Sequence, residues 1–80
     1  MKRNIINRQI RKRLKMSGEE LAKRVEVTKQ TISHYETGKT WSRILERVIE
    51  WELDLAIEQC EDRLIKWDCI NLKLRREEES

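Results

Sequence analysis

Residues 18–37 read GEELAKRVEVTKQTISHYET, and this stretch decides the fold of the chain. Leu21 and Val25 fall on one side of a first short helix, with the small Ala22 beside them. After a polar break, Ile32 and Tyr35 restore the apolar pattern and anchor a second helix. Two short helices that cross steeply need this arrangement, so the stretch predicts a helix-turn-helix.

The opposite face of the second helix is polar and rich in hydrogen-bonding groups. It carries Lys29, Gln30, Ser33 and His34, and within this helix no acidic residue precedes Glu36. A helix with such a face can enter the major groove of DNA and contact base edges. The pattern therefore predicts a reading helix.

Capping residues mark where these helices begin and end. Ser17 followed by Glu20 is a capping box before the first of them. Thr28 is an N-cap for the second, which is predicted to run to about Thr37 and to end at Gly38. The sequence thus predicts where each helix begins and where the second one ends.

Two further helices are predicted to flank this pair. One runs from Asn4 to Lys15, because apolar residues recur at every fourth position: Ile6, Ile10 and Leu14. Its other face is basic, and we expect some of its cations to reach DNA phosphates: Arg3, Arg8, Arg11, Lys12, Arg13 and Lys15. The other helix follows Ser42, with these expected apolar contacts: Leu45, Val48, Ile49 and Trp51.

The C-terminal third shows a heptad pattern. Its apolar seam, with an Asn at one core position, predicts a dimerisation helix: Leu53, Ile57, Cys60, Leu64, Trp67, Asn71 and Leu74. A second stripe, formed by Ile65, Cys69 and Leu72, predicts instead a helix packed back on its own domain. The preceding helix either continues without a break to Glu77 or breaks near residues 52–54.

Composition and charge fit one small all-α domain of 80 residues. We expect a compact bundle of four or five helices with an extended C-terminal helix. Residues 1–55 form the helix-turn-helix unit, and residues 56–80 form the dimerisation segment with a frayed acidic end at residues 77–80. Residues 1–40 hold 11 Lys or Arg against 4 Glu (+7), and residues 41–80 hold 7 against 11 acidic residues (−4), which gives +3 in total. A basic head of this kind suits a polyanionic partner.

Several other classes of protein do not fit the sequence. It has neither an apolar run of membrane-spanning length nor the apolar stretch of a signal peptide, so we expect a cytoplasmic protein without a membrane partner. Cys60 and Cys69 would lie on opposite sides of a helix, which excludes a disulfide between them within that helix and suggests small apolar side chains in a reducing compartment. His34 is the single histidine and has no catalytic partner nearby in the sequence. We therefore expect no enzyme activity, metal, cofactor or small-molecule ligand.

The string SGEELAKRVEVTKQTISHYETGK, residues 17–39, resembles the Cro/CI (Xre-type) helix-turn-helix family. With the helices before and after it, the resemblance extends over about residues 4–55. It implies a bundle whose third helix lies in the major groove, with base contacts from Lys29, Gln30, Ser33 and His34. It implies phosphate contacts at Arg11, Gly18, Thr28, Thr31, Lys39 and Thr40. It also implies a structural ion pair between Arg11 and Glu36.

The sequence departs from the family pattern at two positions. Gly18 stands where the family often has Gln, which holds a phosphate and braces the reading helix. Glu26 stands where the family usually has Gly in the turn, and a left-handed backbone there costs a non-Gly residue roughly 1 kcal/mol. We therefore expect either a slightly different turn or a strained one.

The resemblance implies a sequence-specific transcriptional regulator that binds double-stranded DNA. We expect a repressor of phage or mobile-element type that acts as a homodimer on a two-fold related operator. The alternative is an antitoxin or adaptor whose C-terminal helix binds a protein partner while the head tethers it to DNA. RNA binding is disfavoured, because Tyr35 is needed in the core and no aromatic stacking surface is evident.

Overall fold

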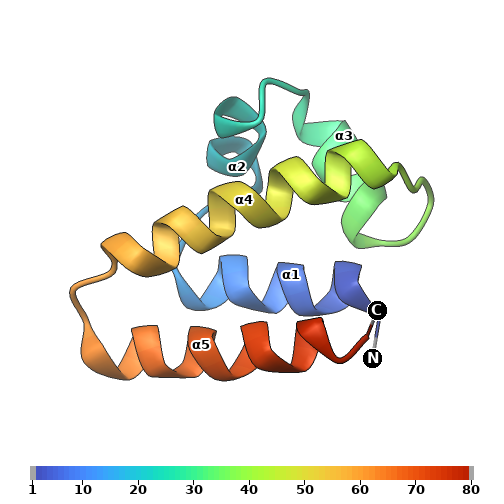
Figure 1. Ribbon diagram of the computed structural model, residues 1–80. Helices are drawn as coiled ribbons and strands as arrows, with labels where there is room; N and C mark the ends of the chain where they lie inside the picture. The colour runs from blue at the N-terminus through green and yellow to red at the C-terminus, as the bar shows by residue number, and fades with distance from the viewer. Residues whose placement is uncertain (1, 80) are drawn as a thin grey trace.

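The computed structural model describes residues 2–79, which form five helices and no strand (Figure 1). The helices are α1 (Arg3–Arg13), α2 (Gly18–Arg24), α3 (Lys29–Glu36), α4 (Arg43–Gln59) and α5 (Arg63–Glu77). In Figure 1, α1 lies between α5 on one side and α2 and α3 on the other. The predicted all-α class, with four or five helices, is confirmed, and the described residues form five.

Side-chain caps start three of the helices where the sequence predicts. The Ser17 hydroxyl accepts a hydrogen bond from the Glu20 N–H at 3.0 Å, and the Thr28 hydroxyl accepts one from the Thr31 N–H at 3.2 Å. Ser42 caps α4 in the same way, through the N–H of Leu45 at 3.3 Å. Each hydroxyl satisfies a backbone N–H that has no partner within its helix.

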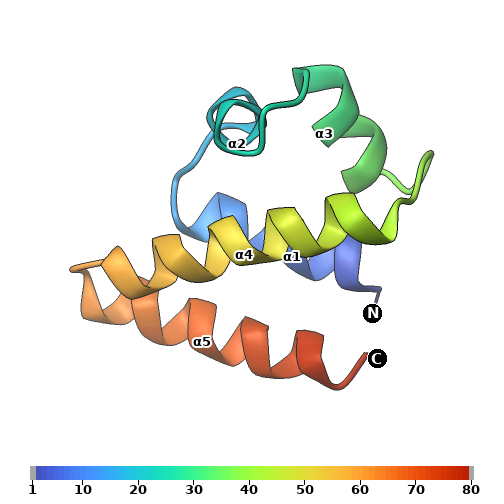
Figure 2. The ribbon, with the colours of Figure 1, turned by 45° about the horizontal axis from the view of Figure 1, so that its top comes forward.

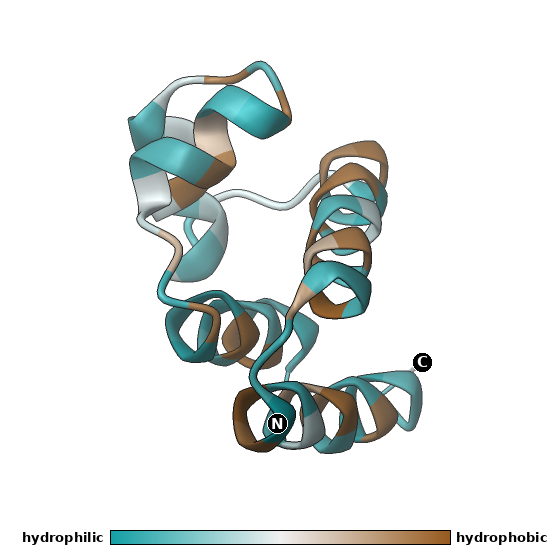
Figure 3. Ribbon diagram, turned by 90° about the vertical axis from the view of Figure 1, so that its left-hand side faces the viewer, coloured by the Kyte–Doolittle hydropathy of each residue, from teal (hydrophilic) through white to brown (hydrophobic). Residues whose placement is uncertain are grey.

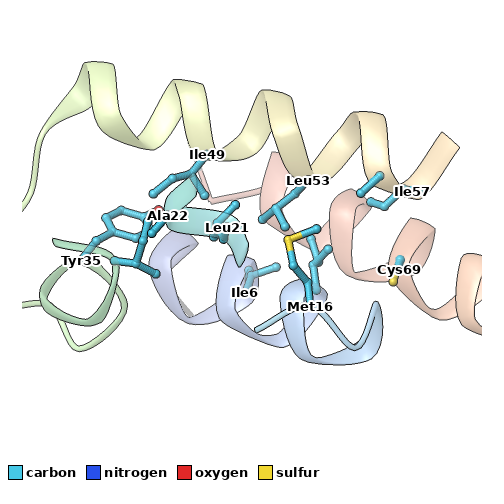
Figure 4. Close-up of a cluster of buried hydrophobic side chains, with 12 residues drawn as sticks. Ile6, Met16, Leu21, Ala22, Tyr35, Ile49, Leu53, Ile57 and Cys69 are labelled. Carbon is cyan, nitrogen blue, oxygen red and sulfur yellow. The ribbon is translucent and has the colours of Figure 1, made fainter. Parts of the chain in front are cut away.

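The core lies where all five helices converge (Figure 4). Its buried apolar residues are Ile6, Ile10, Met16, Leu21, Ala22, Ile32, Tyr35, Ile49, Leu53, Ala56, Ile57 and Cys69. Two of the contacts expected of α4 are wrong, because Val48 is 39% exposed and Trp51 is 68% exposed. At about 100° per residue, these two side chains point away from the face that carries Ile49 and Leu53.

The C-terminal segment folds back instead of continuing α4. Neither an unbroken helix to Glu77 nor a break at residues 52–54 is correct, because α4 ends at Gln59 and α5 begins at Arg63. Asp62 is the N-cap of α5, because its carboxylate accepts hydrogen bonds from the N–H groups of Leu64 at 3.0 Å and Ile65 at 3.2 Å. The boundary expected after residue 55 lies inside α4, and Ser80 of the acidic end lies outside the described residues.

This fold divides the expected heptad seam. Leu53 and Ile57 are buried in the core, and Cys60 is half-buried in the connection between α4 and α5. The remaining seam residues lie on the exposed face of α5: Leu64, Trp67, Asn71 and Leu74. One continuous dimerisation seam is therefore wrong. The off-seam stripe faces inward, because Cys69 is fully buried and Ile65 and Leu72 pack against the core.

A buried ionic network fastens α5 to α1 and α4. Arg76 is only 1% exposed and donates hydrogen bonds to the Asn7 amide oxygen at 3.1 Å and to the two Asp54 carboxylate oxygens at 3.0 and 3.1 Å. Arg3 donates to both oxygens of Glu50 at 2.9 and 2.7 Å. The network pairs charges that burial would otherwise destabilise, while the buried Arg76 Nε lies 3.8 Å from Glu50 and makes no hydrogen bond within residues 2–79. No helix within residues 2–79 is long and apolar enough to span a membrane.

Candidate nucleic-acid interface

The α2–α3 pair projects from one side of the bundle. In Figures 1 and 2, α2 and α3 lie together on the side of α1 opposite to α5. The turn between them is closed by a hydrogen bond from the Val27 N–H to the Ala22 carbonyl at 2.9 Å. Leu21 and Ala22 on α2 are buried against Ile32 and Tyr35 on α3, as two steeply crossing helices require.

The polar face of α3 is turned toward solvent. All four of the predicted base-contacting residues are exposed and lie next to one another on the helix: Lys29, Gln30, Ser33 and His34. Ile32 and Tyr35, each 1% exposed, hold the helix from behind. The acidic C-terminal segment does not cover this face, because α5 packs on the opposite side of α1.

The predicted phosphate-contacting residues surround this face with unequal exposure. Thr28, Lys39 and Thr40 are exposed at the two ends of α3, while Thr31 is half-buried. Among residues 2–79, neither Lys29 nor Lys39 forms an ion pair, so both ammonium groups are free for an anionic partner. The two ends of α3 therefore combine hydroxyl donors with unpaired cations.

Arg11 is held by the protein itself. Its Nε and Nη2 donate to the two carboxylate oxygens of Glu36 at 2.7 and 3.0 Å, and its Nη1 donates to the Met16 carbonyl at 2.7 Å. The side chain is 11% exposed and that of Glu36 is 8% exposed. The structure thus brings the expected pair together and commits Arg11 to positioning the end of α3. Its expected phosphate contact stays a prediction.

Three residues that the sequence pattern did not indicate, Asn4, Asn7 and Glu46, brace α3 further. The Tyr35 hydroxyl donates to a Glu46 carboxylate oxygen at 2.6 Å and accepts from the Asn7 amide at 2.9 Å. Burial and the hydrogen bond to Glu46 raise the pKa of Tyr35, so the hydroxyl stays protonated and keeps donating. Asn4 also donates to the Glu36 carbonyl at 3.0 Å. These contacts fix the reading helix to α1 and α4.

The position that the family often fills with Gln is open in this chain. Gly18 is the first residue of α2, and a Cβ built there meets no atom within 4 Å. Its φ is not positive, so the glycine is required neither for space nor for backbone conformation. The missing side chain removes one polar group from the edge of the interface.

Glu26 adopts the strained turn that the sequence analysis considered. Its φ is +58°, in the left-handed region that favours glycine, and Lys15 has a similar φ of +59°. Both residues follow a helix end directly, where a left-handed residue redirects the chain. The strain is accepted because Val25 and Val27 on either side of Glu26 pack against the core.

Replacing Glu26 with glycine is therefore expected to raise the free energy of unfolding by about 0.5–1 kcal/mol. Glycine adopts a positive φ without steric conflict, and Glu26 is exposed and makes no ion pair with another described residue. The check is urea unfolding followed by circular dichroism. Lys23→Gly is the control, because the same change at an exposed helical position should lower stability by about 1 kcal/mol. An unchanged or lower stability of Glu26→Gly would contradict the assignment of strain.

Comparison with protein families agrees with this geometry. Residues 8–44 match a family model described as helix-turn-helix, which covers α2, the turn and α3. The matched segment, 37 of the 80 residues, is similar to the Cro/CI (Xre-type) helix-turn-helix family. Comparison with curated proteins and with solved structures gave no match. Helix-turn-helix domains of this kind bind DNA, and the match therefore supports a DNA-binding regulator.

Proposed function

We propose that this regulator is sequence-specific and acts as a repressor of phage or mobile-element type, as a dimer on a two-fold related operator. The observation that carries the proposal is the exposed polar face of α3 with its rigid support behind it. In the major groove, Gln30 can pair with adenine through two hydrogen bonds, and Lys29 can donate to guanine. Thr28 and Lys39 at the two ends of the helix suit phosphate contacts.

The dimer follows from the small size of the reading element. A single α3 of eight residues makes few base contacts, whereas two heads on half-sites one helical turn apart combine their contacts. The chain measures 32 × 26 × 17 Å between its Cα extremes. Half-sites one helical turn apart lie about 34 Å from each other, so two copies of this size fit side by side on them.

The experiment that tests the proposal compares two substitutions on two duplexes. Fluorescence anisotropy measures binding to a duplex from the region upstream of the gene, or to one selected from random sequences, and to a scrambled duplex. Gln30→Ala should weaken binding to the specific duplex by about 1–3 kcal/mol and leave the scrambled duplex unaffected. Lys39→Ala should weaken both and reduce the slope of log K against log salt by about 1.

Gln59→Ala is the matched control, because Gln59 is an equally exposed glutamine at the far end of α4. It should bind both duplexes as the unchanged protein does. Equal affinity for the specific and scrambled duplexes, together with no effect of Gln30→Ala, would contradict sequence reading by α3.

A second candidate function is an antitoxin or adaptor. The exposed face of α5 favours it, because Leu64, Trp67 and Leu74 are 80%, 63% and 60% exposed. A protein partner bound there would leave α3 free to tether the complex to DNA. Sedimentation of the pure protein discriminates: a stable homodimer supports the regulator, and a monomer that associates only with a partner supports the adaptor.

A further inference from the structure

The outer face of α4 is apolar and mostly exposed, with Leu55 half-buried at its C-terminal end. Ile44, Val48, Trp51 and Leu55 fall on the side of the helix opposite to the buried face, and we call these four residues the α4 stripe. Ile44 is 78% exposed and Trp51 is 68% exposed, and Trp41 just before the helix is 69% exposed. Figure 3 shows hydrophobic segments recurring along the length of α4. The core needs only one face of this helix, so the second apolar face calls for another explanation.

We propose that the α4 stripe is a homodimer interface in which two copies of α4 pack antiparallel about a two-fold axis. This inference deepens the proposed function and rests on it, because it names the surface that joins the two DNA-binding heads. Its occupant is a second copy of the same chain.

The exposed area is adequate for such a contact. A large aromatic side chain buries roughly 150–250 Å², so Trp41, Trp51 and Ile44 together present on the order of 400 Å² of mostly apolar surface. Two copies that meet there bury about twice this area, and flanking side chains bring the total near the roughly 1,000 Å² of a specific interface. Apolar patches of this size on a monomer are often functional.

The order of the stripe suits a two-fold axis. Its residues are spaced 4, 3 and 4 positions apart, a sequence of intervals that reads the same in both directions. In an antiparallel pair, Ile44 therefore faces Leu55 of the second copy, and Val48 faces Trp51. A two-fold interface has to be self-complementary in this way.

The charges beside the stripe have the matching arrangement. Arg43 and Arg47 precede the centre of α4 on one flank, and Asp54 and Glu58 follow it on the same flank, with intervals of 4, 7 and 4. Antiparallel packing places Arg43 opposite Glu58 of the second copy and Arg47 opposite Asp54, so both pairings are attractive. Parallel packing about a two-fold axis would put the charged flanks of the two copies on opposite sides of the contact, so neither pairing would form.

These charged groups are available for a second copy. Arg43, Arg47 and Glu58 are exposed and form no ion pair with any residue from 2 to 79. Asp54 pairs with Arg76 and Lys73 in its own chain but keeps a side-chain exposure of 30%. The stripe also borders an open groove of about 770 Å³ lined in part by Trp41, Trp51 and the two arginines.

The exposed stripe of α5 has a similarly symmetric spacing, with intervals of 3, 4 and 3 between Leu64, Trp67, Asn71 and Leu74. It fits a second copy less well because the polar Asn71 interrupts it, whereas every residue of the α4 stripe is apolar. The observations therefore favour α4 over α5, and α5 serves as the matched control.

The first test is sedimentation equilibrium of the full chain without DNA. We expect a dimer at micromolar concentration that Trp51→Glu weakens at least 100-fold, because the new carboxylate has to be buried. Trp67→Glu is the same change at a tryptophan of similar exposure on α5 (63% against 68%), and it should alter the dimerisation constant less than threefold. Circular dichroism should show unchanged helix content, since both side chains are exposed.

Three results would overturn the proposal. The first is a protein that stays monomeric at hundreds of micromolar. The second is an unchanged dimerisation constant in Trp51→Glu. The third is a loss in Trp67→Glu as large as in Trp51→Glu, which would assign the contact to α5 or to another partner surface.

A charge exchange tests the antiparallel arrangement separately. Arg43→Glu and Glu58→Arg alone should each weaken dimerisation about tenfold at low salt, because each change creates two like-charge contacts across the axis. The double variant should return within threefold of the original constant. A double variant as weak as the two single changes combined would overturn the antiparallel pairing.

DNA binding distinguishes failure of this inference from failure of the proposed function. Trp51→Glu should keep a Gln30-dependent preference for a single half-site and lose the gain in affinity from a second one. A dimer that forms through α4 but shows no sequence preference would leave the interface standing and contradict the proposed regulator. A dimer that forms through α5 and binds DNA with a sequence preference would contradict the α4 interface and leave the proposed regulator standing.

Discussion

Arg76→Met is expected to lower the free energy of unfolding by about 3 kcal/mol, a large part of the 5–15 kcal/mol of a natural domain. Arg76 is 1% exposed, and its guanidinium joins Asn7 on α1 to Asp54 on α4. Methionine fills a similar length but leaves the Asn7 oxygen without this donor and the Asp54 carboxylate with Lys73 alone. Removing one partner of a buried ion pair is costly because the remaining charge stays desolvated.

Urea unfolding at neutral pH measures this effect, and Arg75→Met is its control. Arg75 is the adjacent residue, is exposed and forms no ion pair among residues 2–79, so its loss should change stability by less than about 0.5 kcal/mol. If Arg76→Met remained within about 1 kcal/mol of the unchanged protein, the network would contribute little to attaching α5.

The same network predicts how the free energy of unfolding depends on pH. Burial acts to raise the pKa of Glu50, but hydrogen bonds from Arg3 and Asn7 and the charge of Arg76 together hold it below its ordinary value of 4.5. Glu50 therefore contributes stability at pH values above that ordinary pKa, and the contribution is lost as the pH falls through the lowered one. Arg76→Met removes one of these causes, so its acid unfolding should begin at a higher pH.

The helix-turn-helix was predictable because its signals are local. The caps Ser17 and Thr28 lie next to the helices they start, and Ile32 and Tyr35 mark the buried side of α3 at helical spacing. The exposed reading face followed from the same spacing. In contrast, Asn7 lies 28 positions from Tyr35 and Glu46 lies 11 positions from it. No local sequence pattern predicts hydrogen bonds between residues so far apart.

The C-terminal third was misread for a physical reason. Apolar residues occupy two faces of α5. The sequence is therefore compatible with a heptad seam that contacts a second chain and with a stripe that packs against the domain's own core. The deciding residue is Asp62, whose role as an N-cap was hidden among other charged residues. Arg76 was not identified because an arginine in a charged helix end is usually solvated. Here the neighbouring carboxylates allow its burial.

Arg11→Met is expected to have the other large effect. It should lower both the free energy of unfolding and the affinity for specific DNA, because Arg11 holds the end of the reading helix. Arg11 and Glu36 form a two-point ion pair in which both side chains are nearly buried, at 11% and 8% exposure. Methionine would leave the Glu36 carboxylate with only the distant Arg8 at 3.9 Å, so we expect a loss of about 3 kcal/mol in the free energy of unfolding. The C-terminal end of α3 would also lose one of its anchors to α1, although the hydrogen bond from Asn4 to the Glu36 carbonyl would remain.

Arg13→Met separates this effect from a simple loss of positive charge. Arg13 lies on the same helix and pairs with Asp68, but both side chains are about half exposed, at 58% and 49%. Its substitution should change stability by less than about 1 kcal/mol, and it should not weaken the specific duplex more than the scrambled one. Arg11→Met, measured at a temperature where it stays folded, should weaken the specific duplex more than the scrambled one. Equal losses on both duplexes would show that Arg11 acts on DNA as a charge and does not position α3.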